Sequence, residues 1–579
     1  MDFESDTRIL KSQKKLNEDQ TTQEGGMDSK HEKCIVQTQN GWVCGYIDKR
    51  DEGTYYKFKS IPYAEPPVGN LRFMPPKCVK PWKNILDCTK DASLPLSLFV
   101  NQEVFGSEDC LYIEVSSPNI KPEKPLPVMF WIGSCNFVFY IDSILDPTHL
   151  NNQGIVFVRC GFRLGPFGFL SINDFSAPGN VGLKDLILAF KWVQANITYF
   201  GGDPNNVTAF GSGTGGAIVH LMTLSPLAGG LFHKAIVQSS SALNGWSLAK
   251  NPVENAMTLA KHLGIKKTDK FEVVEEMRKL SGYNIMKTYS TFLFDKYRVE
   301  NDVFDSPFKP SIENEFEGQP TFISKSPSKI LNSGNFNKVP IMIGTNNVEA
   351  KVLQYIKDGF YKDYNKYNED VRHLVPKSLA NVNSDSLRKI GQQILSFYFV
   401  GVEKFNEQSI KQYLQFLTDY YFHYYLDKTI RIHSKVSPEC PIYYYVLNYA
   451  GEWLVPKELE FFNTIGHTAE LPFLFRIKSS DGSFYKGSCI SLTTRDRCVK
   501  MWTNFAKYGN PTPTDNDELL QITWDSVENE KRLNFLSISS DLTKGRNPFY
   551  KRMLFWESIH KEHIVLKVIT HMNDMGLKF

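Results

Sequence analysis

The sequence of 579 residues lacks the features that mark several classes of protein. It contains no run of about eighteen apolar residues, so we expect no membrane span. Its 66 Lys and Arg residues are balanced by 63 Asp and Glu residues, without the basic excess of a nucleic-acid-binding protein. The ten cysteines include no CxxC pair and no Cys/His cluster at zinc spacing, so we expect no metal site.

The N-terminal segment also lacks an apolar stretch of the kind that a secretion signal needs. Residues 1–33 are polar and carry charges of both signs, a composition that favours a disordered tail. We therefore expect a cytoplasmic protein whose scattered cysteines stay reduced.

Beyond the tail, short apolar runs alternate with helix-like stretches. The runs span 126–132, 154–160, 207–210, 234–240, 339–345 and 442–449, and the helix-like stretches include 182–199 and 250–263. Strands that are apolar throughout are typical of a parallel sheet covered by helices on both faces. No linker or repeat interrupts this pattern, which predicts one α/β domain over residues 34–579.

A glycine-rich turn, GSGTGG at 211–216, follows one of these runs and precedes a helix-like stretch. As a GxGxxG dinucleotide motif it would need an acidic residue about twenty positions further on, and residues 231–245 contain none, so we expect no cofactor. As a GxSxG nucleophile elbow it would have Gly213 at its apex, which offers no nucleophile. A third interpretation is a tight turn that only allows close packing.

Motifs along most of the chain resemble the type-B carboxylesterase and cholinesterase family. They are FKSIPYAEPPVGNLRFMPP (58–76), SEDCLYIEV (107–115), FRLGPFGFLS (162–171), APGNVGLKDLILAFKWVQANI (177–197), FGGDPNNVTAFG (200–211), GLFHKAIVQSSSA (230–242), IGTNNVEA (343–350), IGHTAELPFLF (465–475) and MWTNFAKYGNP (501–511). The chain is most similar to insect-type intracellular esterases. The resemblance implies an α/β-hydrolase fold, with a mostly parallel central sheet, flanking helices and a gorge above the sheet.

The resemblance also implies a triad of Ser, Glu and His in that chain order. The acid position is Glu349 and the base position is His467, whereas the nucleophile position is Gly213, 136 residues before the acid. This spacing is normal for the family, so the glycine is a substitution, similar to the turn of neuroligins. Ser212 and Thr214, on either side, are expected to point away from the histidine.

The family's oxyanion loop, a run of glycines before a phenylalanine, is also altered. The two donor positions are Cys135 and Asn136, and the third donor, the backbone N–H of Thr214, is expected to remain. Loss of the serine in a protease triad costs about a millionfold in kcat, and loss of one oxyanion donor costs roughly 3 kcal/mol. We therefore expect no useful esterase turnover.

Two functional hypotheses follow. The first is a catalytically silent carboxylesterase homologue that binds a small apolar or ester ligand in its gorge, or a protein partner on its surface. The second is a hydrolase of weak or altered activity through His467 and Glu349, with Ser212 or Cys135 as a substitute nucleophile. The alternative to any chemical role is that His467 and Glu349 persist only as a hydrogen-bonded pair that supports the fold.

The resemblance implies further structural roles. Arg72 and Glu108 occupy the positions of a buried salt bridge, and Cys110 is retained although its disulfide partner position is Pro95. Residues 555–572 are predicted to form a helix, which either joins a homodimer or packs on the domain. The apolar residues of this helix that would make either contact are Ile564, Val565, Leu566, Val568 and Ile569. Its three histidines, His560, His563 and His571, are expected on the solvated face.

Overall fold

The computed structural model describes residues 32–574, except 100, 141, 301–303, 356–363, 456–462 and 480–482. Residues 1–31, most of the predicted tail, lie outside the described residues. For Glu32 and Lys33 the predicted disorder is wrong, because both residues belong to the first strand and pair with Ile47 and Tyr46. The regular hydrogen bonding of an antiparallel ladder orders them despite their charge.

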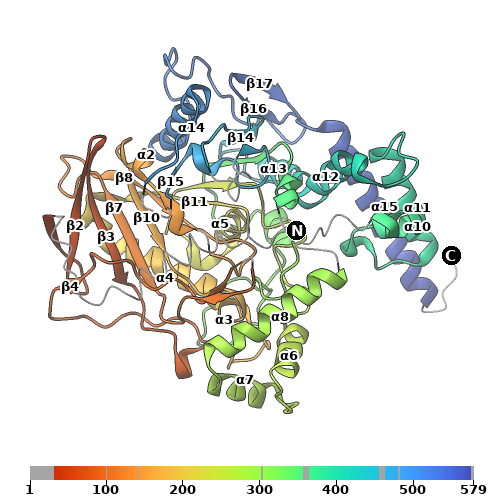
Figure 1. The fold of residues 1–579 in the computed structure, drawn as a ribbon, viewed down its shortest axis with the longest axis horizontal. Helices are drawn as coiled ribbons and strands as arrows, with labels where there is room; N and C mark the ends of the chain where they lie inside the picture. The colour runs from red at the N-terminus through yellow and green to blue at the C-terminus, as the bar shows by residue number, and fades with distance from the viewer. Residues whose placement is uncertain are drawn as a thin grey trace, which may run out of the picture.

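One large, twisted sheet runs through the molecule (Figure 1). Its strands follow in the order β1 (Glu32–Gln37), β2 (Trp42–Arg50), β3 (Gly53–Pro62), β7 (Tyr112–Ser117), β10 (Val156–Cys160), β8 (Leu126–Trp131), β11 (Gly202–Ser212), β12 (Lys234–Gln238), β13 (Ile341–Asn346), β14 (Ile442–Leu447), β16 (Asn534–Ile538) and β17 (Leu542–Arg546). In this order, every neighbouring pair from β10 through β8 to β16 is parallel, and the antiparallel pairs lie toward the two edges of the sheet. The six predicted strands are the parallel strands β8 and β10 to β14, so the predicted α/β architecture is confirmed.

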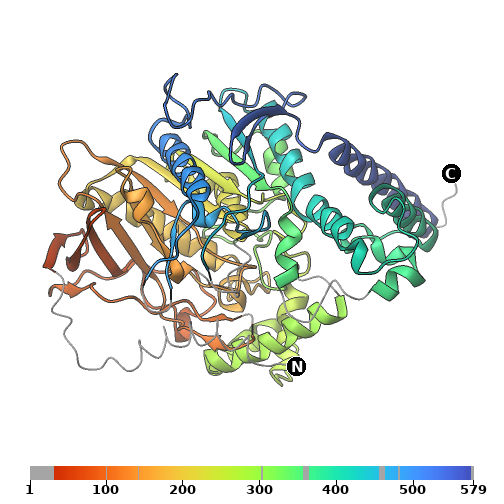
Figure 2. The same ribbon diagram turned by 45° about the horizontal axis from the view of Figure 1, so that its top comes forward.

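Helices cover both faces of this sheet because the side chains of each strand alternate between two cores. On β8, Phe130 packs in one core, whereas Met129 and Trp131 pack in the other. Helices α4 (Val181–Asn196), α5 (Thr214–Leu224) and α6 (Pro252–His262) contribute to the first core, and α2 (Thr148–Asn151) and α14 (Cys489–Tyr508) contribute to the second. Figures 1 and 2 show these helices on opposite sides of the sheet.

A third apolar core joins helices beyond the end of the sheet that carries β14 and β16. It includes side chains from α11 (Ser384–Tyr398), α12 (Ile410–Thr418) and α15 (Tyr550–Asp574), with Trp556 fully buried among them. These helices lie together at one end of the molecule in both views (Figures 1 and 2). The pattern of apolar runs in the sequence did not predict that these helices form a core of their own.

Helix α15 confirms the helix predicted at 555–572. Ile564 and Val565 are 63% and 57% exposed, whereas Leu566 packs against the third core. The predicted solvated face is wrong for two histidines. The ring of His560 stacks on that of Tyr424 with centroids 4.4 Å apart, and Nε2 of the buried His563 lies 2.7 Å from Oδ1 of Asn381. The side chains of Val568, Ile569 and His571 lie outside the described residues.

The implied salt bridge is present and nearly buried. Nε and Nη2 of Arg72 each donate to Glu108 at 2.6 Å, and Nη1 donates to three backbone carbonyls at 2.7–3.2 Å. Cys110 is buried, and all ten cysteines are free thiols. Within the described part of the chain, no helix is long and apolar enough to cross a membrane.

Candidate functional site

The glycine-rich turn forms a sharp bend at the carboxyl end of β11. Strand β11 ends at Ser212 and α5 begins at Thr214, with Gly213 between them at φ 58° and ψ −121°. This backbone region strongly favours glycine. A Cβ at Gly215 would lie 2.1 Å from the carbonyl oxygen of Ile132, so glycine also allows the helix to approach β8. The bend therefore places Gly213 above the edge of the sheet where parallel strands end.

Glu349 and His467 meet beside this bend. Glu349 follows β13, and its Oε2 lies 2.7 Å from Nδ1 of His467. The two residues are also joined through the backbone, where the His467 N–H donates to the Glu349 carbonyl at 2.9 Å. The other carboxylate oxygen of Glu349 accepts from the Thr345 hydroxyl at 2.8 Å and from the Asn346 N–H at 2.6 Å. Every polar atom of this buried carboxylate is thus hydrogen-bonded.

These contacts shift the pKa values of both residues in the directions that favour a carboxylate paired with an imidazolium. Burial by itself raises the pKa of Glu349, but the hydrogen bond and charge of His467 outweigh it and lower the pKa. Burial likewise lowers the pKa of His467, but the hydrogen bond and charge of Glu349 outweigh it and raise the pKa. The carboxylate therefore stabilises the imidazolium form.

The imidazole of His467 points directly at Gly213. A Cβ built on Gly213 would lie 2.4 Å from Nε2 and 2.9 Å from Cε1 of the ring, well inside ordinary van der Waals contact. The ring thus occupies space that a side chain at position 213 would need. The structure therefore brings together the three positions that the sequence singled out, in an arrangement fitted to glycine.

The hydroxyl groups beside Gly213 are directed to other partners. The Ser212 hydroxyl donates to Oε1 of Glu470, and the Thr214 hydroxyl donates to the carbonyl of Ser134 at 2.7 Å. The buried Glu470 also accepts from Nε2 of Gln238 at 3.1 Å and from Nδ2 of Asn346 at 2.8 Å. Neither hydroxyl is therefore poised as a nucleophile in this structure.

The loop at 133–139, where the sequence places two oxyanion donors, is closed by its own hydrogen bonds. The Cys135 N–H donates to the carbonyl of Phe139 at 3.0 Å, and the Phe139 N–H donates back at 2.9 Å. Asn136 has a φ of 50°, and its amide Nδ2 donates to the Tyr297 hydroxyl. Burial raises the pKa of the Cys135 thiol to about 11. The Cys135 N–H is thus already satisfied, and its thiol is held protonated.

Aromatic side chains stand next to the imidazole. The rings of Phe422 and His467 have centroids 5.2 Å apart, and Phe422 in turn contacts Phe304 at 5.4 Å and Trp246 at 6.0 Å. The His467 side chain is 16% exposed, so part of it remains accessible to solvent. This arrangement can place an apolar group against Phe422 and a hydrogen-bond acceptor near the imidazolium.

Comparison with known proteins identifies the family of this chain. The sequence profile of the carboxylesterase family matches residues 32–556. The chain belongs to the carboxylesterase family. It is 31% identical to juvenile hormone esterase of Tribolium castaneum over 568 residues, covering 90% of this chain and 93% of the relative. It is 30% identical to venom carboxylesterase-6 of Apis mellifera, covering 90% and 94% of the two chains.

A solved structure supports the same assignment. The crystal structure of juvenile hormone esterase from Manduca sexta, with OTFP covalently attached, matches with a TM-score of 0.78 at 25% identity. The match covers 92% of this carboxylesterase-family chain and all of the Manduca protein. The α/β-hydrolase fold implied by the sequence motifs is thereby confirmed.

Sequence reasoning missed the hydrogen-bond network under the bend. Glu470 lies three residues after His467, within the apolar segment ELPFLF, and is only 3% exposed. An acidic residue inside an apolar segment is a signal for a buried, hydrogen-bonded carboxylate. Its partner Gln238 is the last residue of strand β12.

Proposed function

We propose that this carboxylesterase-family chain is catalytically silent and that its site binds rather than hydrolyses. Gly213 takes the nucleophile position, with Glu349 and His467 as the remaining acid and base. The single observation that carries this proposal is the 2.4 Å between Nε2 of His467 and the place of a Cβ on Gly213. A serine there would need its Oγ at hydrogen-bond distance from Nε2, whereas even its Cβ lacks room.

The loop at 133–139 supports the same proposal. Oxyanion stabilisation requires N–H groups that point at the reacting oxygen, and the Cys135 N–H points instead at the Phe139 carbonyl. The third donor position expected from the sequence is the N–H of Thr214, at the start of α5. Neither half of the acyl-transfer machinery is then complete.

We further propose that the ligand is a small apolar molecule, such as one bearing an ester. The aromatic ring of Phe422 beside His467 supports an apolar contact, and the imidazole supports a polar one. Two of the similar proteins are named as juvenile hormone esterases, which favours an ester as the ligand. A protein partner, or a homodimer through the exposed Ile564 and Val565 of α15, is a further proposal.

A second candidate function is a weak or altered hydrolase. The observation in its favour is the retained contact of 2.7 Å between Nδ1 of His467 and Oε2 of Glu349, which could orient the imidazole as a general base toward water. Without a nucleophile such a hydrolase would be slow, since general-base catalysis alone accelerates a reaction by about 10²–10⁴-fold.

Hydrolysis of 4-nitrophenyl butyrate by the full chain separates the two functions. The proposal predicts a rate equal to that of the His467→Ala variant, because the imidazole supports no turnover. Turnover that His467→Ala abolishes would establish the hydrolase instead. Binding is measured separately, by quenching of tryptophan fluorescence with a non-hydrolysable apolar ether. Phe422→Ala should weaken that binding, and an unchanged affinity would refute the assignment of the ligand to this site.

The free thiols bear on the proposed location. All ten cysteines are unpaired, which fits a reducing compartment and supports a cytoplasmic location.

A further inference from the structure

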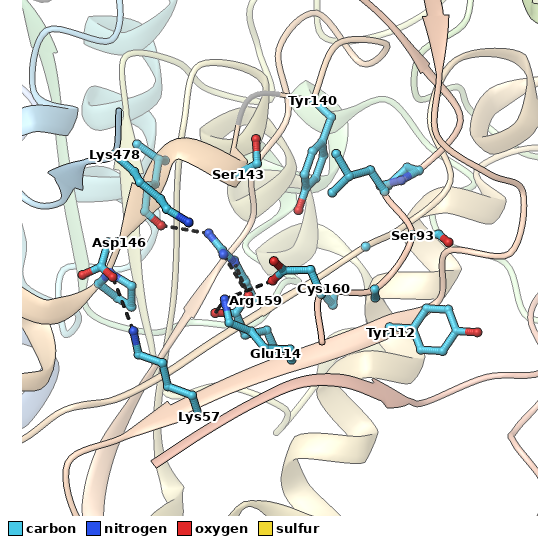
Figure 3. A pocket seen from close by; sticks show the side chains of 18 of the residues that line it. Lys57, Ser93, Tyr112, Glu114, Tyr140, Ser143, Asp146, Arg159, Cys160 and Lys478 are labelled. Carbon is cyan, nitrogen blue, oxygen red and sulfur yellow. Dashed lines mark hydrogen bonds and ion pairs between the residues drawn. The ribbon is translucent and has the colours of Figure 1, made fainter. Parts of the chain in front are cut away.

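A separate cavity of about 490 Å³ lies in the N-terminal half of the molecule (Figure 3). Its lining comes from strands β2, β3, β7 and β10 and from the segments around Asp91, Tyr140 and Lys478. Gly213, Glu349 and His467 are not among the lining residues. The volume falls within the range of small-molecule sites, so the cavity is a candidate binding site independent of the glycine bend.

Ion pairs form the floor of this cavity. Nζ of Lys59 lies 3.1 Å from Oδ1 of Asp91 and 3.2 Å from Oε1 of Glu114, and Nη2 of Arg159 lies 2.8 Å from Oε2 of Glu114. Arg159 is fixed further, because its Nη1 donates to two backbone carbonyls at 2.8 and 2.9 Å. Side chains held in this way are preorganised and lose little freedom when a ligand binds.

The charges of the lining do not cancel. Among the described residues of the lining, five Lys and Arg side chains face four carboxylates, which leaves one positive charge in excess. Lys478 accounts for it, since among the described residues its ammonium has no ion pair, whereas the other four cations do. Its backbone N–H donates to the Ile144 carbonyl at 2.9 Å, directly after the short strand β15 (Arg476–Ile477), which fixes where the side chain begins.

The Tyr140 hydroxyl is a second donor that lines the cavity. Figure 3 shows the Lys478 ammonium and the Tyr140 hydroxyl both pointing toward the centre, where the guanidinium of Arg159 lies. Burial raises the pKa of Tyr140 well above its ordinary value, so the hydroxyl keeps its proton at neutral pH. An acceptor group with negative charge would satisfy both donors.

Other parts of the wall are aromatic. The rings of Phe99 and Phe105 stack with centroids 3.9 Å apart, and the guanidinium of Arg476 lies 3.7 Å from the centroid of Phe484. An inorganic anion would pair with the ammonium but would fill only a small part of a space of about 490 Å³. A planar organic anion matches both kinds of surface.

We propose that this cavity binds a small aromatic carboxylate, whose carboxylate pairs with Lys478 and the Tyr140 hydroxyl and whose ring lies against the aromatic walls. This site does not depend on the function proposed for the glycine bend.

Calorimetric titration of the full chain with 2-naphthoate tests the proposal, with 2-naphthamide as the neutral probe of the same shape. We expect 2-naphthoate to bind at least about tenfold more tightly than 2-naphthamide, because a hydrogen bond to a charged group adds more than a neutral one. Equal affinities, or no binding of 2-naphthoate at millimolar concentration, would overturn the proposal.

Variants assign the binding to the cavity. Lys478→Glu should weaken 2-naphthoate binding about tenfold or more, whereas Lys486→Glu, an exposed lysine of the same segment outside the lining, should leave it within twofold. His467→Ala should leave it unchanged, which separates this cavity from the glycine bend. Loss of binding in His467→Ala, or full binding in Lys478→Glu, would show that the ligand binds elsewhere. Matching thermal unfolding of all variants establishes that each is folded.

Discussion

Gly213→Ser would put a hydroxyl at the nucleophile position, and we predict that it does not restore an esterase. The new Cβ would lie 2.4 Å from Nε2 of His467, whereas ordinary contact begins near 3.4 Å, so the imidazole must retreat by about 1 Å. Two hydrogen bonds to Glu349, at 2.7 and 2.9 Å, oppose that retreat. The residue must also adopt a φ near 58°, which costs about 1–3 kcal/mol for a side chain other than glycine.

Even a well-placed serine would lack an oxyanion donor. Because the Cys135 N–H is bonded to the Phe139 carbonyl at 3.0 Å, stabilisation of the tetrahedral intermediate loses roughly 3 kcal/mol, or about a hundredfold or more in kcat. We therefore expect kcat/KM of Gly213→Ser for 4-nitrophenyl butyrate to stay at least about a hundredfold below that of a competent relative. Adding Cys135→Gly and Asn136→Gly should raise it, since glycines let the loop turn its N–H groups inward.

Gly213→Ala is the matched control, since it adds the Cβ without the hydroxyl. It should show the same loss of stability as Gly213→Ser and no turnover. Turnover by Gly213→Ser equal to that of a competent relative would refute the reasoning, because it would mean that neither the position of His467 nor the closed loop limits catalysis.

Three further predictions concern stability and reactivity. Arg72→Met should lower the free energy of unfolding, measured by urea denaturation, by about 3–5 kcal/mol, because it leaves the nearly buried carboxylate of Glu108 unpaired. The control Lys80→Met, which removes an exposed ion pair, should change it by less than about 1 kcal/mol. The raised pKa of His467 stabilises the fold fully below an unfolded pKa of about 6.5, and this stabilisation is lost as pH rises through the raised value. His467→Gln should therefore destabilise more at pH 6 than at pH 9, and an equal or opposite difference would contradict the charged pair. With a pKa of about 11, the buried thiol of Cys135 should react with iodoacetamide at pH 7.5 far more slowly than the exposed Cys489. Peptide mass spectrometry measures both rates, and comparable labelling of the two cysteines would support Cys135 as a nucleophile.

The sequence alone sufficed for the central architecture. Apolar runs such as 154–160 and 339–345 are buried on both faces, and continuous burial is what makes a parallel strand recognisable. The N-terminal strands β1 to β3 were missed because charged residues interrupt or flank their short apolar runs, and the charges of Glu32 and Lys33 looked like those of a tail. The exact positions of Gly213, Glu349 and His467 followed from motif order.

The distances within the site could not be predicted. That His467 lies so close to Gly213, and that the Cys135 N–H is consumed within its own loop, depends on the packing of segments more than a hundred residues apart. The contacts of His560 and His563 were likewise hidden, because helical periodicity shows which face is apolar but not that histidines can stack or hydrogen-bond within an interface.

Covalent labelling tests the central claim most directly. The full chain is incubated with a fluorophosphonate probe, and its intact mass is measured beside that of the His467→Ala variant. The account predicts no adduct on either protein, since Gly213 offers no nucleophile and the neighbouring hydroxyls are bonded elsewhere. A stoichiometric adduct on the unmodified chain that is absent from His467→Ala would contradict it.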